Sequence, residues 1–210
     1  MKLVVAKEPL RRILKWAQRV LFACAVLLLG YCGFVVVDAW IFQKRQSSDL
    51  ERRLRDQRAA GEGTPQTKSS ASPKGPPAAT DGLIGRIEIL RLGLSAAVVE
   101  GTDKTTFLRA VGHIPGTALP GQPGNVGLAG HRDTFFRPLR NVRRNDIITL
   151  TTLWGEYRYR VVPTRVVSPY DVAVLDPSRN EVLTLVTCYP FYFVGSAPNR
   201  FIVRAERITG

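Results

Sequence analysis

Cysteine is scarce in this 210-residue chain. Its three cysteines are Cys24, Cys32 and Cys188, and the first two lie inside an apolar run. Cys188 therefore has no partner in its own part of the chain, which excludes a disulfide framework there. An unpaired thiol outside the cytoplasm is a candidate reactive group, whereas the plainer interpretation is a buried cysteine that acts as a small hydrophobe.

Histidine is scarcer still, with His113 and His131 alone. No cysteine and histidine spacing typical of a zinc site is present, and no acidic cluster is typical of a dedicated calcium site. We therefore expect no required metal and no cofactor. His113 precedes Ile114-Pro115, and we expect it to have a structural role.

The chain also lacks an aromatic pattern of the kind found in RNA-binding domains. Its formal net charge is +13, divided almost evenly into +7 for residues 1–82 and +6 for residues 83–210. A nucleic-acid footprint normally concentrates its basic residues on one face or helix. Because the basic residues are spread over both regions, we expect no nucleic-acid partner. A basic chain of this kind also suits an anionic lipid bilayer or a cell-wall surface.

Charge is absent from residues 20–37, which form one continuous apolar run. As a helix, these 18 residues would span about 27 Å, close to the roughly 30 Å hydrocarbon core of a bilayer. Trp16 and Trp40 lie on either side, where interfacial aromatic residues are common. No small-x-small cleavage site follows the run, which disfavours a cleaved signal peptide.

The sequence thus predicts a basic N-terminus over 1–19 and a transmembrane signal anchor over 20–42. Six Lys and Arg residues precede the apolar run and six follow it closely, so basic residues alone do not decide the orientation. Residues 43–58 lack Pro and Gly and are charged, whereas residues 61–82 are rich in Gly, Pro, Ser and Thr. We expect a charged stalk and flexible tether over 43–82, followed by a folded domain over 83–210.

That domain has no internal repeats and reads mostly as short strands. Two short helical segments are expected at 106–111 and 135–142, and a loop rich in Pro and Gly at 113–124. The predicted strands are 84–90, 94–99, 125–129, 147–153, 156–162, 165–167, 182–187 and 200–207. This spacing indicates a mainly β fold, an antiparallel barrel or sandwich of about eight strands with one or two short helices.

Three chemically active side chains lie at the ends of predicted strands. Cys188 ends one strand, Arg200 begins the next, and His131 follows the strand 125–129. If the strand that ends at Cys188 and the strand that begins at Arg200 are antiparallel neighbours, these two residues lie at the same end of the sheet. A cation beside a thiol favours the thiolate and stabilises an oxyanion, and an imidazole exchanges protons with the thiol and a leaving amine. Each residue also has a plain alternative, because His131 suits a turn and most arginines are solvated.

Three motifs resemble those of the sortases, the membrane-anchored cysteine transpeptidases of bacteria. Thr184-Leu185-Val186-Thr187-Cys188 is similar to their TLxTC signature, and the segments 125–132 and 199–203 resemble their histidine and arginine segments. The resemblance covers residues 83–210, and the segments 131–136 and 188–191 are most similar to the class D subfamily.

This resemblance implies a closed eight-stranded β-barrel with Cys188, His131 and Arg200 at one rim. The cysteine would attack the threonine carbonyl of a C-terminal Leu-Pro-x-Thr-Gly or Leu-Pro-x-Thr-Ala sorting motif in a secreted protein. An amine of the cell wall or of another protein would then resolve the thioacyl enzyme. The resemblance also implies a single-pass protein of the cell membrane, with a cytoplasmic N-terminus and an extracytoplasmic catalytic domain.

Three other functions stay open. The first is a different cysteine acyl transferase, although an L,D-transpeptidase would be expected to have its His and Cys closer together. The second is a peptidase that uses water in place of the amine at the same site. The third is a non-catalytic anchored domain that binds the cell wall through its basic surface.

Overall fold

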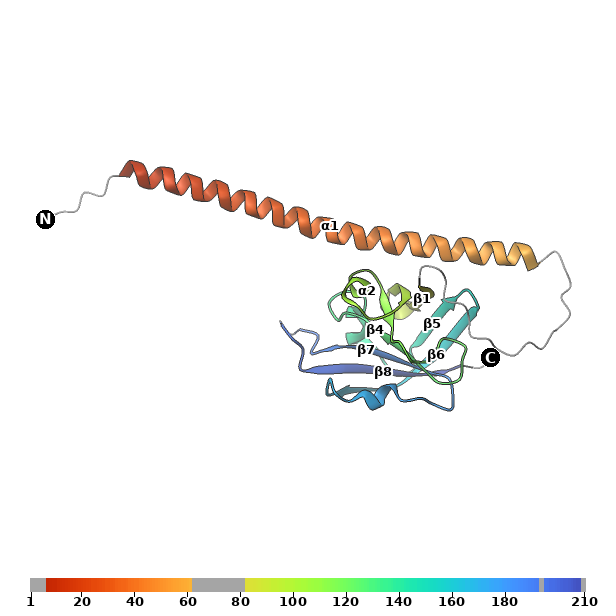
Figure 1. Cartoon of the computed structure of the whole chain (residues 1–210). Helices are drawn as coiled ribbons and strands as arrows, with labels where there is room; N and C mark the ends of the chain where they lie inside the picture. Colours follow the sequence, from red (N-terminus) through yellow and green to blue (C-terminus); the bar gives the residue numbers. More distant parts are fainter. Residues whose placement is uncertain (1–6, 62–81, 193–194, 209–210) are drawn as a thin grey trace. The chain divides into compact units, whose positions relative to one another are not determined.

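The computed structural model describes residues 7–61, 82–192 and 195–208 (Figure 1). The chain divides into two compact units, Met1–Ile41 and Phe42–Gly210. Residues 1–6 of the predicted basic N-terminus and 62–81 of the predicted tether lie outside the described residues.

The first unit contains the beginning of a long helix, α1, which runs over Lys7–Gly61. Among the described residues, one helical stretch, Arg11–Asp56, is apolar and long enough to cross a membrane by length and composition. Its apolar part includes the uncharged residues 20–37. Side chains there are almost all exposed to the surroundings, as is usual for a segment that faces lipid. The helix is consistent with the predicted membrane anchor.

The second unit is built on a closed eight-stranded barrel, which confirms the predicted fold class. The strand order around the barrel is β1-β2-β3-β4-β7-β8-β6-β5. The strands are β1 Leu83–Ile89, β2 Leu94–Glu100, β3 Val111–His113, β4 Asn125–Ala129, β5 Ile147–Thr152, β6 Gly155–Val167, β7 Val182–Tyr189 and β8 Asn199–Arg207. Four short helices accompany them, namely η1 Leu90–Leu92, α2 Lys104–Arg109, η2 Arg137–Asn141 and η3 Val172–Leu175.

Strand pairing differs from the antiparallel expectation at two places. β2 pairs with β3 in parallel, and β4 pairs with β7 in parallel. Parallel neighbours need a crossover connection, whereas a short hairpin gives antiparallel neighbours. α2 lies in the connection between β2 and β3, and the chain forms β5 and β6 before it returns to β4 as β7. The parallel pair of β4 and β7 matters most, because both strands lead to candidate site residues.

Two element boundaries also differ from the sequence predictions. β3 Val111–His113 lies where the sequence indicated the end of a helical segment, 106–111, and the start of a loop at 113, because three residues are too few to give a periodic pattern; the helix itself, α2, ends at Arg109. β6 is continuous over Gly155–Val167, although the sequence suggested separate strands at 156–162 and 165–167. Its pairing with β8 shifts register between Val161 and Thr164, and this irregularity lies where the sequence suggested a break.

The side chains of β7 and β8 alternate between the barrel interior and the opposite face. Leu183 and Leu185 of β7 pack in the core with Val203 and Ala205 of β8. Because successive side chains of a strand point to opposite faces, Cys188 lies on the face away from this core. The alternation expected from the sequence is therefore the one observed.

Part of α1 belongs to the second unit and packs on the barrel. Leu50 is 1% exposed and forms a small apolar cluster with three residues of the barrel strands and with the C-cap residue of α2. These residues are Leu83, Ala97, Val99 and Ala110. The Gln43 side chain accepts a hydrogen bond of 2.8 Å from the backbone N–H of Ala97 and donates one to the Arg109 carbonyl. The predicted stalk is therefore not wholly a spacer, since its first turns complete a second core.

Replacement of Leu50 by alanine is expected to lower the free energy of unfolding of the second unit by about 2–5 kcal/mol. A buried leucine that is truncated loses its transfer free energy and leaves a cavity. Urea denaturation of the full chain in detergent micelles, followed by pulse proteolysis, measures the effect. Arg52→Ala, on the exposed side of the same helical turn, is the matched control. Equal stability of the two variants would contradict the packing of Leu50 on the barrel.

The segment after His131 is anchored at both ends. Phe136 and Leu139 are fully buried in the main core. Arg91 donates a hydrogen bond of 2.7 Å to the carbonyl of Asn141 at the end of η2 and forms an ion pair with Asp146. The hydrogen bond from Arg91 lowers the pKa of Asp146 below its usual value, although burial opposes the shift. The loop that carries His131 therefore leads into a firmly held part of the barrel.

Candidate active site

Cys188 and Arg200 lie directly opposite each other on neighbouring strands. They are register partners in the antiparallel pair of β7 and β8, which run side by side (Figure 1). Directly opposed residues of an antiparallel pair have Cβ atoms roughly 4.5–5.5 Å apart and share one face. The register thus brings the thiol and the guanidinium to one face at the same end of the ladder.

His131 follows the strand that runs parallel to β7 on its other side. Ala129, at the end of β4, pairs with Val186, and the N–H of Gly130 donates to the carbonyl of Val186 at 3.2 Å. The buried hydroxyl of Thr187 then donates to the carbonyl of Gly130 at 2.8 Å. Because these bonds hold the chain beside β7 up to Gly130, His131 leaves β4 next to the strand end that carries Cys188.

The exposure of the three residues suits a site open to a substrate. Cys188 is half-buried and has a free thiol, Arg200 is half-buried, and His131 is exposed. One guanidinium nitrogen of Arg200, Nη1, donates to the carbonyls of Ala197 at 3.2 Å and Asn199 at 3.0 Å. These two hydrogen bonds hold the Arg200 guanidinium at the start of β8. A thiol that faces an arginine across the ladder, with an imidazole just beyond the end of the neighbouring strand, has groups of the kinds that form and resolve a thioester.

An aromatic contact with His131 is a feature that the sequence did not reveal. The ring of Phe107, on α2, lies 5.3 Å from the imidazole centroid at an interplanar angle of 54°. Asp103 is the N-cap residue of α2, and its carboxylate accepts hydrogen bonds from the N–H groups of Thr105 and Thr106. The sequence indicated a helix near this position, but the contact depends on the crossover between β2 and β3.

His113 lies apart from this constellation and is 2% exposed. Its Nδ1 is 2.8 Å from a Glu100 carboxylate oxygen, and its Nε2 is 3.0 Å from both the Ala118 carbonyl and the Thr117 hydroxyl. These contacts tie β3 to the loop that follows it, which favours a structural role. Within the part of the chain that the structure describes, no group of three or more His, Cys, Asp or Glu side chains could hold a metal ion.

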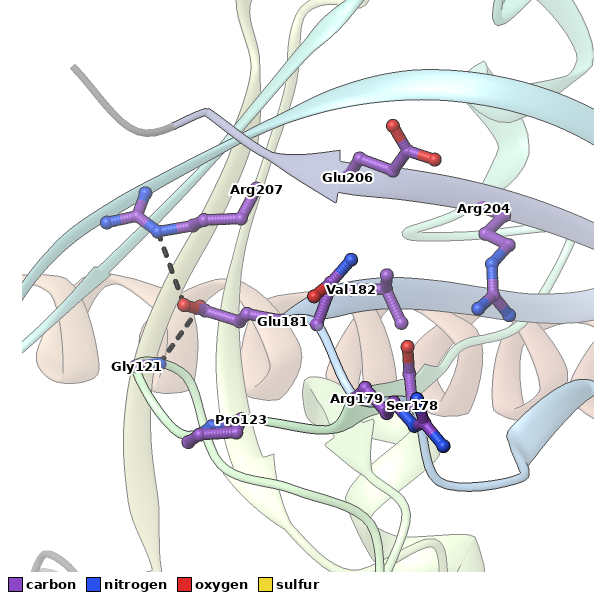
Figure 2. Close-up of a pocket in the computed structure, with 10 residues that line it drawn as sticks. Gly121, Pro123, Ser178, Arg179, Glu181, Val182, Arg204, Glu206 and Arg207 are labelled. Carbon is purple, nitrogen blue, oxygen red and sulfur yellow. Dashed lines mark hydrogen bonds and ion pairs between the residues drawn. The ribbon is translucent and has the colours of Figure 1, made fainter.

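A pocket of about 610 Å³ lies at the opposite end of the β7–β8 pair (Figure 2). Its lining includes Val182 and Glu206, which pair six residues along β7 from Cys188. Glu181 accepts a hydrogen bond from the N–H of Gly121 at 3.1 Å and forms a 3.4 Å ion pair with Arg207, as Figure 2 shows. The pocket therefore does not include the thiol.

The fold and the strand ends together define a β-barrel domain with a cysteine, a histidine and an arginine at adjoining strand ends. A family model described as the sortase domain matches residues 87–208, within the predicted domain 83–210. The chain belongs to the sortase family, a family of cysteine transpeptidases.

Individual relatives agree with this assignment. The chain is 33% identical to sortase D of Bacillus subtilis (strain 168) over 195 residues, 90% of this chain and 96% of the relative, in agreement with the resemblance to class D. Sortase A from Corynebacterium diphtheriae is 29% identical, with a TM-score of 0.58 over 78% of this chain and 84% of that one. A Clostridium perfringens sortase D5 transpeptidase has a TM-score of 0.62 over 80% and 99% of the two chains; at 24% identity it supports the fold alone.

Proposed function

We propose that this chain is a membrane-anchored transpeptidase that cleaves a Leu-Pro-x-Thr-Gly or Leu-Pro-x-Thr-Ala sorting motif and transfers the acyl part to an amine. The observation that carries the proposal is the register of Cys188 with Arg200 at one end of β7 and β8. Family membership supports the reaction class. The hydrogen bonds that hold β4 beside β7 up to Gly130 support a role for His131.

In the first half-reaction, the thiolate of Cys188 attacks the carbonyl carbon of the threonine in the motif. A carbon–sulfur bond forms, and negative charge develops on the carbonyl oxygen. Arg200 faces Cys188 across the ladder and supplies N–H donors and positive charge for this oxyanion. When the tetrahedral intermediate collapses, the carbon–nitrogen bond breaks, and His131 gives its proton to the departing amine. The product is a thioester on Cys188.

In the second half-reaction, an amine of the cell wall or of another protein attacks the thioester carbonyl. His131, now neutral, accepts a proton from this nucleophile. The carbon–sulfur bond breaks and restores the thiolate, and a new amide bond joins the two molecules. If water enters in place of the amine, the same steps hydrolyse the motif.

The proposed location follows from the apolar helix and from the reaction. The uncharged residues 20–37 would span a lipid bilayer, with the N-terminus in the cytoplasm and the catalytic domain outside. Secreted proteins would then present their sorting motif on the side where the cell-wall amine lies. The division into an anchor at 20–42 and a catalytic domain at 83–210 is part of this proposal.

Incubation of the full chain in detergent micelles with sorting pentapeptides and a glycine or alanine nucleophile tests the function. Mass spectrometry should detect an acyl-enzyme on Cys188, the released amine fragment and the ligated product. Cleaved peptide without ligation, at saturating amine, would favour the hydrolase. Failure of every pentapeptide to acylate Cys188 would contradict the proposal and leave the wall-binding domain as the better interpretation.

Replacement of Phe107 by alanine is expected to reduce kcat/KM by about 2–10-fold, because an aromatic pair contributes about 0.5–1.5 kcal/mol beyond its buried area. Without this ring, the His131 imidazole has more freedom to leave its reactive orientation. Leu108→Ala, an exposed site on the same helix, is the matched control. Steady-state kinetics with the best pentapeptide measure the effect, and unchanged kcat/KM for both variants would rule out a role for the ring contact.

A further inference from the structure

Arg132, which directly follows His131, is buried although it carries a charge. It is 6% exposed, whereas Asp133, its neighbour in sequence, has a side chain that is 70% exposed. The Nε of Arg132 is 3.4 Å from a carboxylate oxygen of Asp133. A buried charge is costly unless hydrogen bonds and counter-charges compensate for the lost water. The remaining guanidinium nitrogens must therefore have acceptors within the protein.

Those acceptors lie in the connection between β7 and β8. Nη1 donates to the carbonyl of Pro190 at 2.8 Å, and Nη2 donates to the carbonyl of Gly195 at 3.1 Å. Pro190 is two residues beyond Cys188, and Gly195 is five residues before Arg200. One guanidinium thus joins the backbone next to His131 to the connection that separates Cys188 from Arg200.

Two more arginines contact the described residues of this connection. Arg140 of η2 donates a hydrogen bond of 3.0 Å to the hydroxyl of Tyr192 and lies 5.8 Å from the centre of its ring. Arg200 itself donates to the carbonyl of Ala197. The Arg140 contact is exposed and should be weak, whereas the Arg132 contacts are half-buried charge-assisted bonds to backbone. Arg132 is therefore the main cross-link between the His131 segment and this connection.

The geometry points to Arg132 as a positioning residue for the transpeptidation reaction. We propose that its planar fork fixes the connection after Cys188 against the segment of His131, and thereby sets the relation of thiol, imidazole and guanidinium. This inference rests on the proposed function for its kinetic part. Its structural part, the cross-link to Pro190 and Gly195, is independent of that function.

An arginine is suited to this task in a way that other residues are not. Its N–H groups diverge in a fixed plane, so two separate carbonyls can be bound at once. A lysine in the same place retains the charge but is a point donor on a flexible chain. Alanine leaves both carbonyls without their donor. Small displacements matter at a reacting centre, where an error of about 1 Å can cost about 100-fold in rate.

The test compares Arg132→Ala and Arg132→Lys in the full chain in detergent micelles. Arg137→Ala is the matched control, because Arg137 is an exposed arginine of the same segment. We expect Arg132→Ala to lower kcat/KM by about 10–100-fold, mainly through kcat. Arg132→Lys should retain more activity than Arg132→Ala, and methylguanidinium should restore part of the activity of Arg132→Ala. Arg137→Ala should stay within about twofold of the unaltered protein.

Chymotrypsin cleavage after Phe191 or Tyr192 provides a readout that needs no sorting peptide. Arg132→Ala should be cleaved there faster than Arg137→Ala at the same temperature. Equal kcat/KM and equal cleavage for these two variants would overturn the proposal. A loss of activity without rescue by lysine or methylguanidinium, in proportion to a loss of thermal stability, would show a merely structural role. If none of the pentapeptides acylates the unaltered protein, the proposed function fails. The chymotrypsin cleavage rates still show whether Arg132 holds the connection between β7 and β8.

Discussion

Replacement of Cys188 by alanine is expected to reduce peptide cleavage and amide formation to the background rate, a loss of roughly 10⁴-fold or more. Neither half-reaction has a covalent carrier without the sulfur. Binding of a sorting peptide should persist, because the face around Cys188 keeps its other residues. Cys188→Ser should be nearly as inactive, since a hydroxyl is a far weaker nucleophile than a thiolate. Quantitative mass spectrometry of acyl-enzyme and products measures the loss.

The control uses the two other cysteines, Cys24 and Cys32, which lie in the apolar part of α1. A variant with both replaced by serine should acylate at the rate of the unaltered protein. It also leaves Cys188 as the single thiol, so that any labelling reports on one site. If acylation survives in Cys188→Ala, or disappears in the double variant, the nucleophile is not Cys188 of β7.

The positions of Cys188, Arg200 and His131 near strand ends could be predicted from sequence because each follows or begins a clear strand pattern. Alternation through Leu183 and Leu185 determines which face Cys188 occupies, and a connection of nine residues suits antiparallel neighbours that bring Arg200 opposite the thiol. Both features are local, because they depend only on the pattern and the pairing of two neighbouring strands. The number and spacing of the strands indicated a barrel or a sandwich, and the resemblance to the sortase motifs implied the closed barrel that is observed.

The remaining features depend on contacts between distant parts of the chain. Phe107 reaches His131 only because β2 and β3 pair in parallel around α2, and parallel pairing leaves no short-range mark in the sequence. Leu50 gave no clear signal because its buried partners lie more than 30 residues away, and two leucines, Leu50 and Leu54, in an otherwise charged segment also fit a solvated stalk. Arg132 lies within a recognised motif, but the carbonyls of Pro190 and Gly195 that it binds belong to the backbone. Because every residue has a backbone carbonyl, the sequence could not indicate which ones Arg132 would bind.

Arg200→Ala is expected to lower kcat/KM by about 10²–10³-fold, comparable to the removal of one oxyanion donor from other acyl-transfer enzymes. Arg200→Lys should recover only a small part, because an ammonium cannot reproduce the two-pronged geometry of guanidinium. Arg204→Ala is the matched control: Arg204 lies on the same face of β8 and pairs with Thr184, four residues along β7 from Cys188. Single-turnover acylation measures both variants.

A second measurement separates an electrostatic role of Arg200 from its support of the backbone at Ala197 and Asn199. The rate of Cys188 alkylation by anionic iodoacetate, divided by the rate with neutral iodoacetamide, reports the local positive potential at the sulfur. Removal of a cation that faces the thiol should lower this ratio several-fold at low salt and less at high salt. Arg204→Ala should leave the ratio nearly unchanged, since the Cα atom of Arg204 lies roughly 13 Å further along the strand than that of Arg200. If Arg200→Ala loses activity but keeps the ratio of the unaltered protein, Arg200 acts through the loop backbone and not on the developing oxyanion.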